Sequence, residues 1–388
     1  MSCGFHLIWA VILTEKDTLK ERKMTKKDVC VFALVCFCLT LFSVNLEGQE
    51  IKIKQEDGIT VVNNPLNPVK SLDSSFDMVL KEDLIIGTNE KNTDYYFEVI
   101  SDIKADENGN IYVVDSSANS VKVFNSKGKY LKDIGRQGQG PGEFMAPMGM
   151  AIVKDKISVY SMGRLSFFTL DGDFIQHNKV MFGRLMCFDS EGNIITKVPG
   201  PPGNVFKEFL RKFNPEGKLI LEVAEIVIAP PPSPNEKRKA FPENVLFTVR
   251  QNDSIVWTNR SQYEVNVVGK DGQAFLKIKK ENNPVKLTEK HKQSFLAYYG
   301  AAEDHYTFPQ NLPPIRYICA DNKNRIFVCT YESTGEDTYI YDIFDEQGRY
   351  VERVAIKGLP LFWKKRYLYC RGEDENNFHK VIRYRIET

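Results

Sequence analysis

A pattern of four short strands separated by Gly- and Asn-marked turns limits what this chain can fold into more than any other feature. The pattern is clearest in residues 103–134, where the turn sequences DENG (106–109) and NSKG (125–128) are typical of tight reversals. Alternating hydrophobic residues predict a strand ending at Ala105 and further strands at 111–114, 121–124 and 130–134. This segment is therefore predicted to form a four-stranded antiparallel meander.

The four-strand unit recurs along the chain in degenerate form. The recurrences span residues 150–175, 186–223, 246–278 and 316–354. Their last strands follow polar turns, such as the Gly-ended NPEG (214–217) and DEQG (345–348). A β-sandwich or a jelly roll does not need a periodic turn of this kind, so the recurrence favours a repeat architecture over both.

The two ends of the chain complete one further unit. Strands are predicted at 366–370 and 380–386 with no fourth strand after them, while a strand at 76–80 has no partner of its own. Pairing these ends closes a ring and removes exposed sheet edges, which invite aggregation. The fold class predicted is therefore all-β: a six-bladed β-propeller of four-stranded antiparallel blades, closed by pairing an N-terminal strand with the C-terminal blade.

The connection after the first unit resembles a known repeat. Residues 135–149, GRQGQGPGEFMAPMG, resemble the glycine-rich linker between NHL-type blades, and the preceding segments GNIYVVD (109–115) and VKVFNSKGK (121–129) also resemble the NHL repeat. Over most of residues 76–388 the chain resembles secreted bacterial six-bladed propellers related to NHL-repeat proteins. The resemblance implies a surface for binding partners and says little about chemistry, because propellers host many unrelated functions.

Two features of the first unit that could suggest chemistry are interpreted as structural. The glycines of 135–142 lack the G-x-x-x-x-G-K-[ST] ending of a phosphate loop, and are expected to let the linker turn sharply and pack closely. Asp115 ends the second strand, where an aspartate of NHL-like repeats resembles a turn-fixing residue that accepts backbone N–H bonds.

Residues 1–48 differ in composition from the rest of the chain. Lys26 and Lys27 precede an uncharged run at 29–44, which is typical of a secretory signal and short for a bilayer span of about 20 apolar residues. An uncleaved anchor, or a lipid attached to Cys36 or Cys38, is the alternative. The expected parts are an upstream extension and signal peptide (1–48), a lead segment (49–75) and the propeller (76–388). The expected location is exported: periplasmic, cell-surface or extracellular.

The cysteines beyond the predicted signal leave two interpretations open. They are Cys187, Cys319, Cys329 and Cys370. Four cysteines allow three pairings, and Cys319 and Cys329 flank a predicted tight turn across which they would face each other. The alternative is four buried free thiols. No C-x-x-C occurs, so neither a zinc ribbon nor a thioredoxin-like motif is indicated.

Loop lengths indicate which face of the propeller carries function. The turns between first and second strands and between third and fourth strands are tight, and they open onto one face. The connections between second and third strands and between blades open onto the opposite face, called the long-loop face below. Long connections there span 199–208, 224–244, 279–314 and 330–338. Long loops gathered on one face of a rigid scaffold are a common design for binding.

Three segments of these connections have their own character. Residues 229–241, APPPSPNEKRKAF, are proline-rich and then basic, and are expected to form an exposed flexible arm. Residues 286–298 begin with Thr288 as a helix cap and contain a short amphipathic run. Residues 306–314, YTFPQNLPP, are expected to lie flat across the face, or to pack over a blade edge.

The candidate ligand-binding residues on this face are mostly arginines, whose planar guanidinium suits carboxylate or phosphate groups. They are Arg136 and Glu143 in the glycine-rich linker, followed by Arg164, Arg184, Arg260 and Arg316. For each arginine taken alone, the alternative is a solvated or salt-bridged surface residue.

The charge balance narrows the class of partner. Lys and Arg number 52 and Asp and Glu 51, a net charge of +1, so nothing indicates nucleic acid. The expected partner is a protein, peptide or glycan, and the protein is expected to be a monomer that meets the membrane only through its N-terminal signal segment. No cofactor is predicted and no catalytic or metal-binding residue is assigned.

An enzyme remains the alternative function. There is no H-E-x-x-H and no G-x-S-x-G motif. Some six-bladed propellers hold a metal in the central channel, as the NHL-like peptidyl-hydroxyglycine lyases hold zinc, so a hydrolase or lyase with Ca or Zn in the channel is the second hypothesis. His177 is the best-placed histidine for such a site, and acids such as Asp102 and Glu143 could meet in three dimensions.

Overall fold

The computed structural model describes residues 50–69, 78–87, 92–180, 183, 185–201, 205–228, 230, 233, 236–335 and 337–387. The chain divides into two compact units, Met1–Glu50 and Ile51–Thr388, and the second contains every strand and helix described below. The predicted signal segment lies outside the described residues. Within the described residues, no helix is long and apolar enough to cross a membrane.

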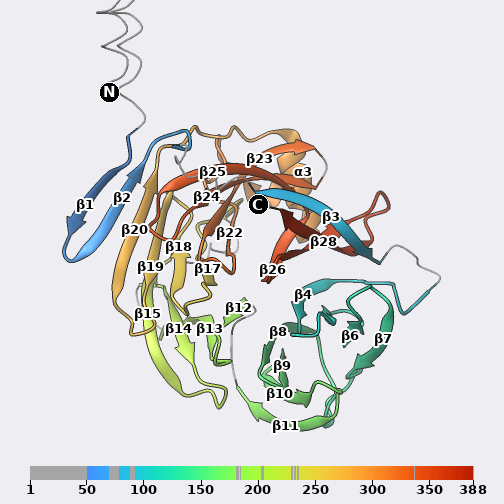
Figure 1. Ribbon diagram of the computed structural model, residues 1–388. Helices are drawn as coiled ribbons and strands as arrows, with labels where there is room; N and C mark the ends of the chain where they lie inside the picture. Colours follow the sequence, from blue (N-terminus) through green and yellow to red (C-terminus); the bar gives the residue numbers. More distant parts are fainter. Residues whose placement is uncertain are drawn as a thin grey trace, which may run out of the picture. The chain divides into compact units, whose positions relative to one another are not determined.

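Within the described residues, Ile51–Thr388 forms six four-stranded antiparallel blades (Figure 1). Blade 1 is β4 (Ile100–Ala105), β5 (Ile111–Asp115), β6 (Ser120–Phe124) and β7 (Tyr130–Ile134). Blade 2 is β8 (Pro147–Val153), β9 (Lys156–Ser161), β10 (Arg164–Thr169) and β11 (Phe174–Lys179). Blade 3 is β12 (Met186–Phe188), β13 (Ile194–Pro199), β14 (Lys207–Phe213) and β15 (Leu219–Val227).

The second half of the chain continues the series. Blade 4 is β17 (Leu246–Val249), β18 (Ile255–Thr258), β19 (Glu264–Val268) and β20 (Ala274–Lys280). Blade 5 is β22 (Tyr317–Ala320), β23 (Ile326–Gly335), β24 (Thr338–Phe344) and β25 (Tyr350–Lys357). Blade 6 is β26 (Leu359–Lys364), β27 (Tyr367–Glu373), β28 (His379–Glu387) and β3 (Val79–Ile86).

Blade 6 is built from both ends of the unit. β3 pairs antiparallel with β28, from Val381 opposite Ile86 to Glu387 opposite Val79. The strand expected at 76–80 in fact begins at Val79 and continues to Ile86. The sequence analysis also missed β26, because Pro360 interrupts its pattern, and the pairing of β26 with β27 shifts register between Pro360 and Phe362.

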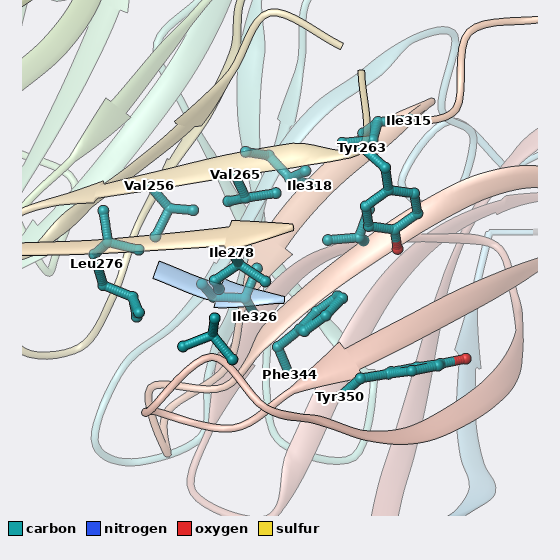
Figure 2. Packing of buried hydrophobic residues seen from close by; sticks show 13 residues of the cluster. Val256, Tyr263, Val265, Leu276, Ile278, Ile315, Ile318, Ile326, Phe344 and Tyr350 are labelled. Atoms are coloured by element: carbon teal, nitrogen blue, oxygen red, sulfur yellow. The ribbon is translucent and has the colours of Figure 1, made fainter. Parts of the chain in front are cut away.

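The core lies between neighbouring blades rather than within any one of them. Between blades 4 and 5, side chains such as Val256 and Ile278 pack against Phe344 (Figure 2). Between blades 6 and 1, Tyr369 packs in one cluster with Ile103, so the last blade is joined to the first. Each such side chain contributes about 1.5–3 kcal/mol by leaving water, which makes blade stacking the main stabilising contact.

The glycine-rich linker has the structural role expected of it. Gly135 has a φ of 76°, and a Cβ there would overlap the ring of Phe144. That ring is fully buried and lies edge-on to Phe168, with 5.5 Å between ring centroids. The linker can follow this path only without a side chain at Gly135, so the interpretation of a sharp turn with close packing is confirmed.

Asp115 also has its expected structural role. Its two carboxylate oxygens accept the backbone N–H groups of Glu98 at 2.9 Å, Val99 at 3.1 Å and Ala118 at 3.1 Å. The side chain is fully buried, so these bonds replace the water that a carboxylate would otherwise require. Asp115 therefore fixes the approach to β4 and the turn that follows β5.

A hairpin in the N-terminal lead segment extends blade 4. β1 (Lys52–Glu56) pairs with β2 (Ile59–Asn64), and β2 pairs in parallel with β20, which makes a six-stranded sheet. The chain then reaches blade 5, where the N–H of Val69 donates to the carbonyl of Tyr350 at 3.1 Å. The sequence analysis assigned no structure to residues 49–75, because this hairpin lies outside the repeat.

The four cysteines of the propeller are free thiols. In the pairing of β22 with β23, Cys319 lies opposite Phe327 and Cys329 opposite Tyr317, so the two thiols do not face each other directly. Burial raises the pKa of Cys329 to about 12. The interpretation as free thiols therefore holds, with Cys187 only half-buried.

The connections before blades 4 and 5 carry the remaining elements. α3 (Glu289–Tyr299) begins after Thr288, whose Oγ1 accepts the N–H of His291 at 3.4 Å, as the cap prediction expects. β16 (Arg238–Lys239) pairs in parallel with β21 (Tyr306–Thr307), which follows the 3-10 helix η2 (Glu303–His305). The expectation of a flexible arm through residue 241 is therefore wrong for its basic end, which backbone hydrogen bonds fix.

Candidate functional site

The arginines expected to form one contact face fall into two separate groups. Arg136, Glu143 and Arg164 lie together at the linker between blades 1 and 2. Arg260 and Arg316 lie together over blades 4 and 5. Arg184 lies outside the described residues.

The first group is held by partners within the chain. The Nε of Arg136 donates to Glu143 Oε1 at 3.0 Å, and the backbone N–H of Gly140 donates to Glu143 Oε2 at 2.8 Å. The Gly140 N–H and then Arg136 lower the pKa of the Glu143 carboxyl. Arg164 donates through Nη1 to the carbonyl of Gln139 at 2.6 Å. Arg136 corresponds to the salt-bridged alternative and Arg164 is bonded to a backbone carbonyl, so both hold the linker in place.

The second group is centred on an aromatic ring. The guanidinium carbon of Arg260 lies 5.7 Å from the centroid of the Tyr331 ring, and Nη2 of Arg260 donates to the tyrosine hydroxyl. Arg316 approaches the same ring at 5.9 Å and lies 3.6 Å from the centroid of the Tyr339 ring. Tyr331 therefore joins two arginines that are far apart in the sequence.

Local backbone structure explains how these side chains meet. The hairpin of β23 and β24 continues beyond the blade, where Ser333 pairs with Tyr339. That extension carries Tyr331 and Tyr339 onto the long-loop face. Arg316 directly precedes β22, and its N–H donates to the carbonyl of Cys329 at 2.8 Å. Each residue is thus positioned by the end of a blade strand.

Arg260 reaches the ring from the turn between β18 and β19. Its backbone has a φ of 57°, and its N–H donates to Thr258 Oγ1 at 3.0 Å. A left-handed backbone at a residue with a long side chain is uncommon and costs free energy. The local structure therefore holds the arginine in a conformation that glycine would adopt more easily.

Aromatic side chains around α3 enlarge this surface. Phe295 is 8% exposed, and its ring lies 4.7 Å from Phe241, 4.7 Å from Tyr299 and 5.1 Å from Tyr306, measured between centroids. The Phe241 ring is also 5.9 Å from Tyr331, which links the helix to the arginines. Figure 1 shows α3 beside β23.

The whole assembly is called the aromatic–arginine cluster below. It consists of Phe241, Arg260, His291, Phe295, Tyr298, Tyr299, Tyr306, Phe308, Arg316, Tyr331 and Tyr339. Its outer edge is the pair Tyr298 and Tyr299, which are 83% and 55% exposed and lie edge-on at 4.9 Å. Exposed aromatic rings beside charged donors are typical of binding surfaces.

The two arginines of the cluster have no ion pair within the described residues. Within the described residues, no carboxylate lies at ion-pair distance from Arg260 or Arg316. Burial, then Arg316 and Lys290, lower the pKa of His291. Burial raises the pKa of Tyr331, and Arg260 opposes that rise. The guanidinium groups of Arg260 and Arg316 therefore lie over tyrosine rings, and no carboxylate of the described residues neutralises them.

The central channel has a different composition. The first strands of successive blades contact one another, as β4 contacts β8, and so line the axis. On β4, Asp102 accepts the N–H of Met150 at 2.9 Å and bonds to Lys104. Among the described residues, no group of three or more His, Cys, Asp or Glu is placed to hold a metal. His177, the best-placed histidine in the sequence, lies on β11, the outermost strand of blade 2, away from the first strands that line the axis.

The sequence pointed to the two arginines of the cluster and to the segment 306–314, which contains Tyr306 and Phe308, but not to the other aromatic members. The missed residues that join the parts are Phe241, Phe295, Tyr299 and Tyr331. A signal existed in the density of aromatic residues in FLAYYGAAEDHYTF, residues 295–308. Their contacts with Arg260 and Tyr331 depend on the ring of blades, which no local pattern encodes.

Comparison with known proteins supports the fold. The family DUF5128, described as a 6-bladed beta-propeller, matches residues 51–195. A suspected exported protein of Bacteroides fragilis is 11% identical, with a TM-score of 0.51 over 84% of this chain and 100% of that one. No curated protein sequence matches the chain. With the observed blades, these findings identify the chain as a six-bladed β-propeller.

Two further structures are similar at lower scores. A DUF4221 family member of Bacteroides vulgatus is 13% identical, with a TM-score of 0.49 over 80% of this chain and 99% of that one. Virginiamycin B lyase of Staphylococcus aureus is 12% identical, with a TM-score of 0.38 over 80% of this chain and 99% of that one. Likenesses at these levels say nothing about what this chain binds or catalyses.

Proposed function

We propose that this chain is an exported propeller scaffold that binds a protein, peptide or glycan partner on its long-loop face. The observation that carries the proposal is the aromatic–arginine cluster, in which α3, the turn after β18 and the β23–β24 hairpin bring rings and guanidinium groups into one surface. Aromatic and arginine side chains dominate the energetics of many binding surfaces, because they bury large areas and carry directional donors.

Two further expectations belong to this proposal. Export is supported by the signal-like composition of residues 1–48 and by the description of the Bacteroides fragilis relative as a suspected exported protein. A nucleic-acid partner is disfavoured by the net charge of +1. The protein is proposed to act as a monomer, with the membrane involved only through the N-terminal segment.

Binding to arrays of oligosaccharides and peptides tests the proposal. The full chain, labelled on a lysine, is compared with the double variant Tyr298→Ala/Tyr299→Ala. We expect the variant to lose about tenfold or more of the signal on whichever array the parent binds, because both rings are exposed and make few contacts within the fold. The matched control is Arg136→Gln on the same face. Equal binding by the double variant would place the site elsewhere.

The enzyme alternative, a hydrolase or lyase with Ca or Zn in the channel, remains a second hypothesis with its own test. Elemental analysis of protein purified without chelators would support it through a stoichiometric metal signal. If the double tyrosine variant still bound the arrays and the protein also contained a stoichiometric metal, the functional site would be placed in the channel rather than at the cluster.

A further inference from the structure

We infer that Arg260 and Arg316 form a carboxylate-binding subsite, and that the ligand is an oligosaccharide containing uronic acid residues. This inference rests on the proposed binding function and adds the chemistry of the group that the cluster recognises.

Two arginines with little exposure elsewhere in this protein have a salt-bridge partner. Nε of Arg383 lies 3.0 Å from the carboxylate of Asp83, and Nε of Arg325 lies 2.7 Å from that of Asp321. Arg250, which is buried and has no salt bridge within the described residues, lies near the charges of Glu346, Asp345 and Asp321.

Arg316 is also only partly exposed. Within the described residues, no oxygen accepts a hydrogen bond from its guanidinium group. A partly desolvated cation without a counterion favours an anion supplied from outside.

Arg260 shows the same deficit. Its Nε is buried and has no hydrogen-bond partner among the described residues, and its sole donated side-chain bond goes to the Tyr331 hydroxyl. Nearby His291 has a pKa lowered by Arg316 after burial, so the surroundings of the two arginines disfavour a further positive charge. An anion placed beside Tyr331 would relieve this repulsion.

Two side chains that contact Tyr331 come from residues with a left-handed backbone. Arg260 and Phe241 have φ angles of 57° and 51°, and both side chains contact Tyr331. Two bulky residues in the left-handed region cost about 1–2 kcal/mol each. Bulky residues at other turns, such as Met162 and Lys365, share this conformation, so its relevance here is that both strained residues contact the same ring.

The geometry of Arg316 suits a carboxylate. Its guanidinium carbon lies 3.6 Å from the centroid of the Tyr339 ring, which is face-to-face stacking distance. A stacked guanidinium keeps its N–H donors in the plane of the group, where they point past the ring and can bind a carboxylate bidentately. Stacking also limits the rotamers of the side chain, so less entropy is lost on binding.

The exposed part of the cluster favours a sugar as the source of the carboxylate. Within the described residues, its large exposed hydrophobic side chains are Tyr298 and Tyr299, rather than aliphatic ones. Aromatic faces are electron-rich and attract the polarised C–H groups of a pyranose ring, while hydroxyls bond to its hydroxyl groups. A carboxylate on the same ring would complete this pattern with Arg260 and Arg316.

Isothermal titration calorimetry of the full chain tests the subsite near neutral pH. The probes are trimers of galacturonic, glucuronic and guluronic acids, the methyl-esterified galacturonate trimer and maltotriose. We expect at least one acidic trimer to bind, and its neutral counterpart to bind about tenfold more weakly, because the loss of a hydrogen bond to a charged group is of that size. Added salt should weaken binding of the acid alone.

Variants assign the effect to the two arginines. Arg316→Gln and Arg260→Gln should each weaken the acidic trimer about tenfold or more, whereas Arg316→Lys should recover only part of the affinity, because the ammonium lacks the planar fork. Arg136→Gln on the same face should bind as the parent does. Circular dichroism and thermal melting verify that every variant is folded.

Each outcome decides the inference. Acidic and neutral trimers that bind equally, with arginine variants like the parent, would overturn the carboxylate subsite, while loss in Tyr298→Ala/Tyr299→Ala would leave the proposed function standing. Triglutamate serves as a peptide probe with the same kind of acidic group. If it bound more tightly than every uronate trimer, the assignment of the ligand as a sugar would be overturned. No binding of any acidic trimer would overturn the inference, and silent arrays would overturn the proposed function as well.

Discussion

The linker group and the aromatic–arginine cluster lie on the same face and are built from the same residue type, yet they differ in how their arginines are satisfied. Arg136 is 82% exposed and has Glu143, whereas Arg260 and Arg316 are less exposed and have tyrosine rings. The more exposed Arg136 forms a salt bridge, whereas the less exposed Arg260 and Arg316 form none within the described residues. Arg136 and Arg164 are each bonded to an oxygen of the linker. The guanidinium groups of Arg260 and Arg316 instead contact tyrosine side chains, and this difference separates the two groups.

Replacing the buried phenylalanine of each region, Phe144 at the linker and Phe295 in the cluster, should change the free energy of unfolding more than any other substitution considered below. Phe144→Ala should lower the free energy of unfolding by about 3–5 kcal/mol, because its ring fills the core between blades 1 and 2. Phe295→Ala should cost less, about 2 kcal/mol, because the connections around α3 can collapse into the space. Urea unfolding followed by fluorescence measures both, and equal losses would break the comparison.

Glycines in the left-handed region offer a matched pair. Gly135→Ala should cost about 2 kcal/mol or more, because the new methyl group would overlap the Phe144 ring. Gly300→Ala at the end of α3 should cost about 1 kcal/mol, because nothing lies within 4 Å of its Cβ position. Denaturation midpoints of the two variants give the difference, and a larger loss at Gly300 would contradict it.

Replacing the strained arginine should separate stability from binding. Arg260→Gly should change the free energy of unfolding by less than about 1 kcal/mol, because relief of the φ of 57° offsets the lost Tyr331 contact. Arg164→Gly at the linker should be destabilising, since that residue donates to Gln139 and lies in β10. A destabilisation by Arg260→Gly as large as that by Arg164→Gly would show that Arg260 is structural.

The smallest effect concerns pH. The pKa of His291 is lowered from its usual 6.5 by burial, Arg316 and Lys290, so the unfolded chain binds its proton more readily than the folded chain. Stability from this group is present above about pH 6.5 and is lost as pH falls below it. His291→Gln should flatten that dependence, because the variant has no group that titrates there. Unfolding measured across that range tests it, and an unchanged slope would show that His291 does not contribute to the pH dependence.

The repeat made most of the fold predictable, and the exceptions have physical causes. Blades 1 to 5 were predicted because each polar turn and hydrophobic alternation is local in sequence. β26 was missed because Pro360 breaks the strand pattern. The β1–β2 hairpin was missed because it lies outside the repeat, although the Asp57–Gly58 turn is a local hairpin signal. Its pairing with β20 could not be predicted, because it joins residues more than two hundred positions apart.

The candidate site was predictable only in part, for a similar reason. Arg260 and Arg316 could be selected because their residue type and loop position are visible in the sequence. Whether an arginine has an acidic neighbour depends on tertiary contacts, so nothing local distinguishes Arg316 from Arg136. Tyr331 and Phe295 lie in segments whose approach is set by the stacking of blades 4 and 5.

The path of the N-terminal segment has a mechanical consequence. The chain pairs with blade 4 through β2, bonds to blade 5 at Val69, and reaches blade 6 only at β3. A pulling force applied at the N-terminus would therefore load the hairpin and the β2–β20 ladder before it reached the strand that completes the last blade. In a propeller tethered at its N-terminus, tension would therefore act first on blade 4, and it would reach β3, the strand that closes the ring, last.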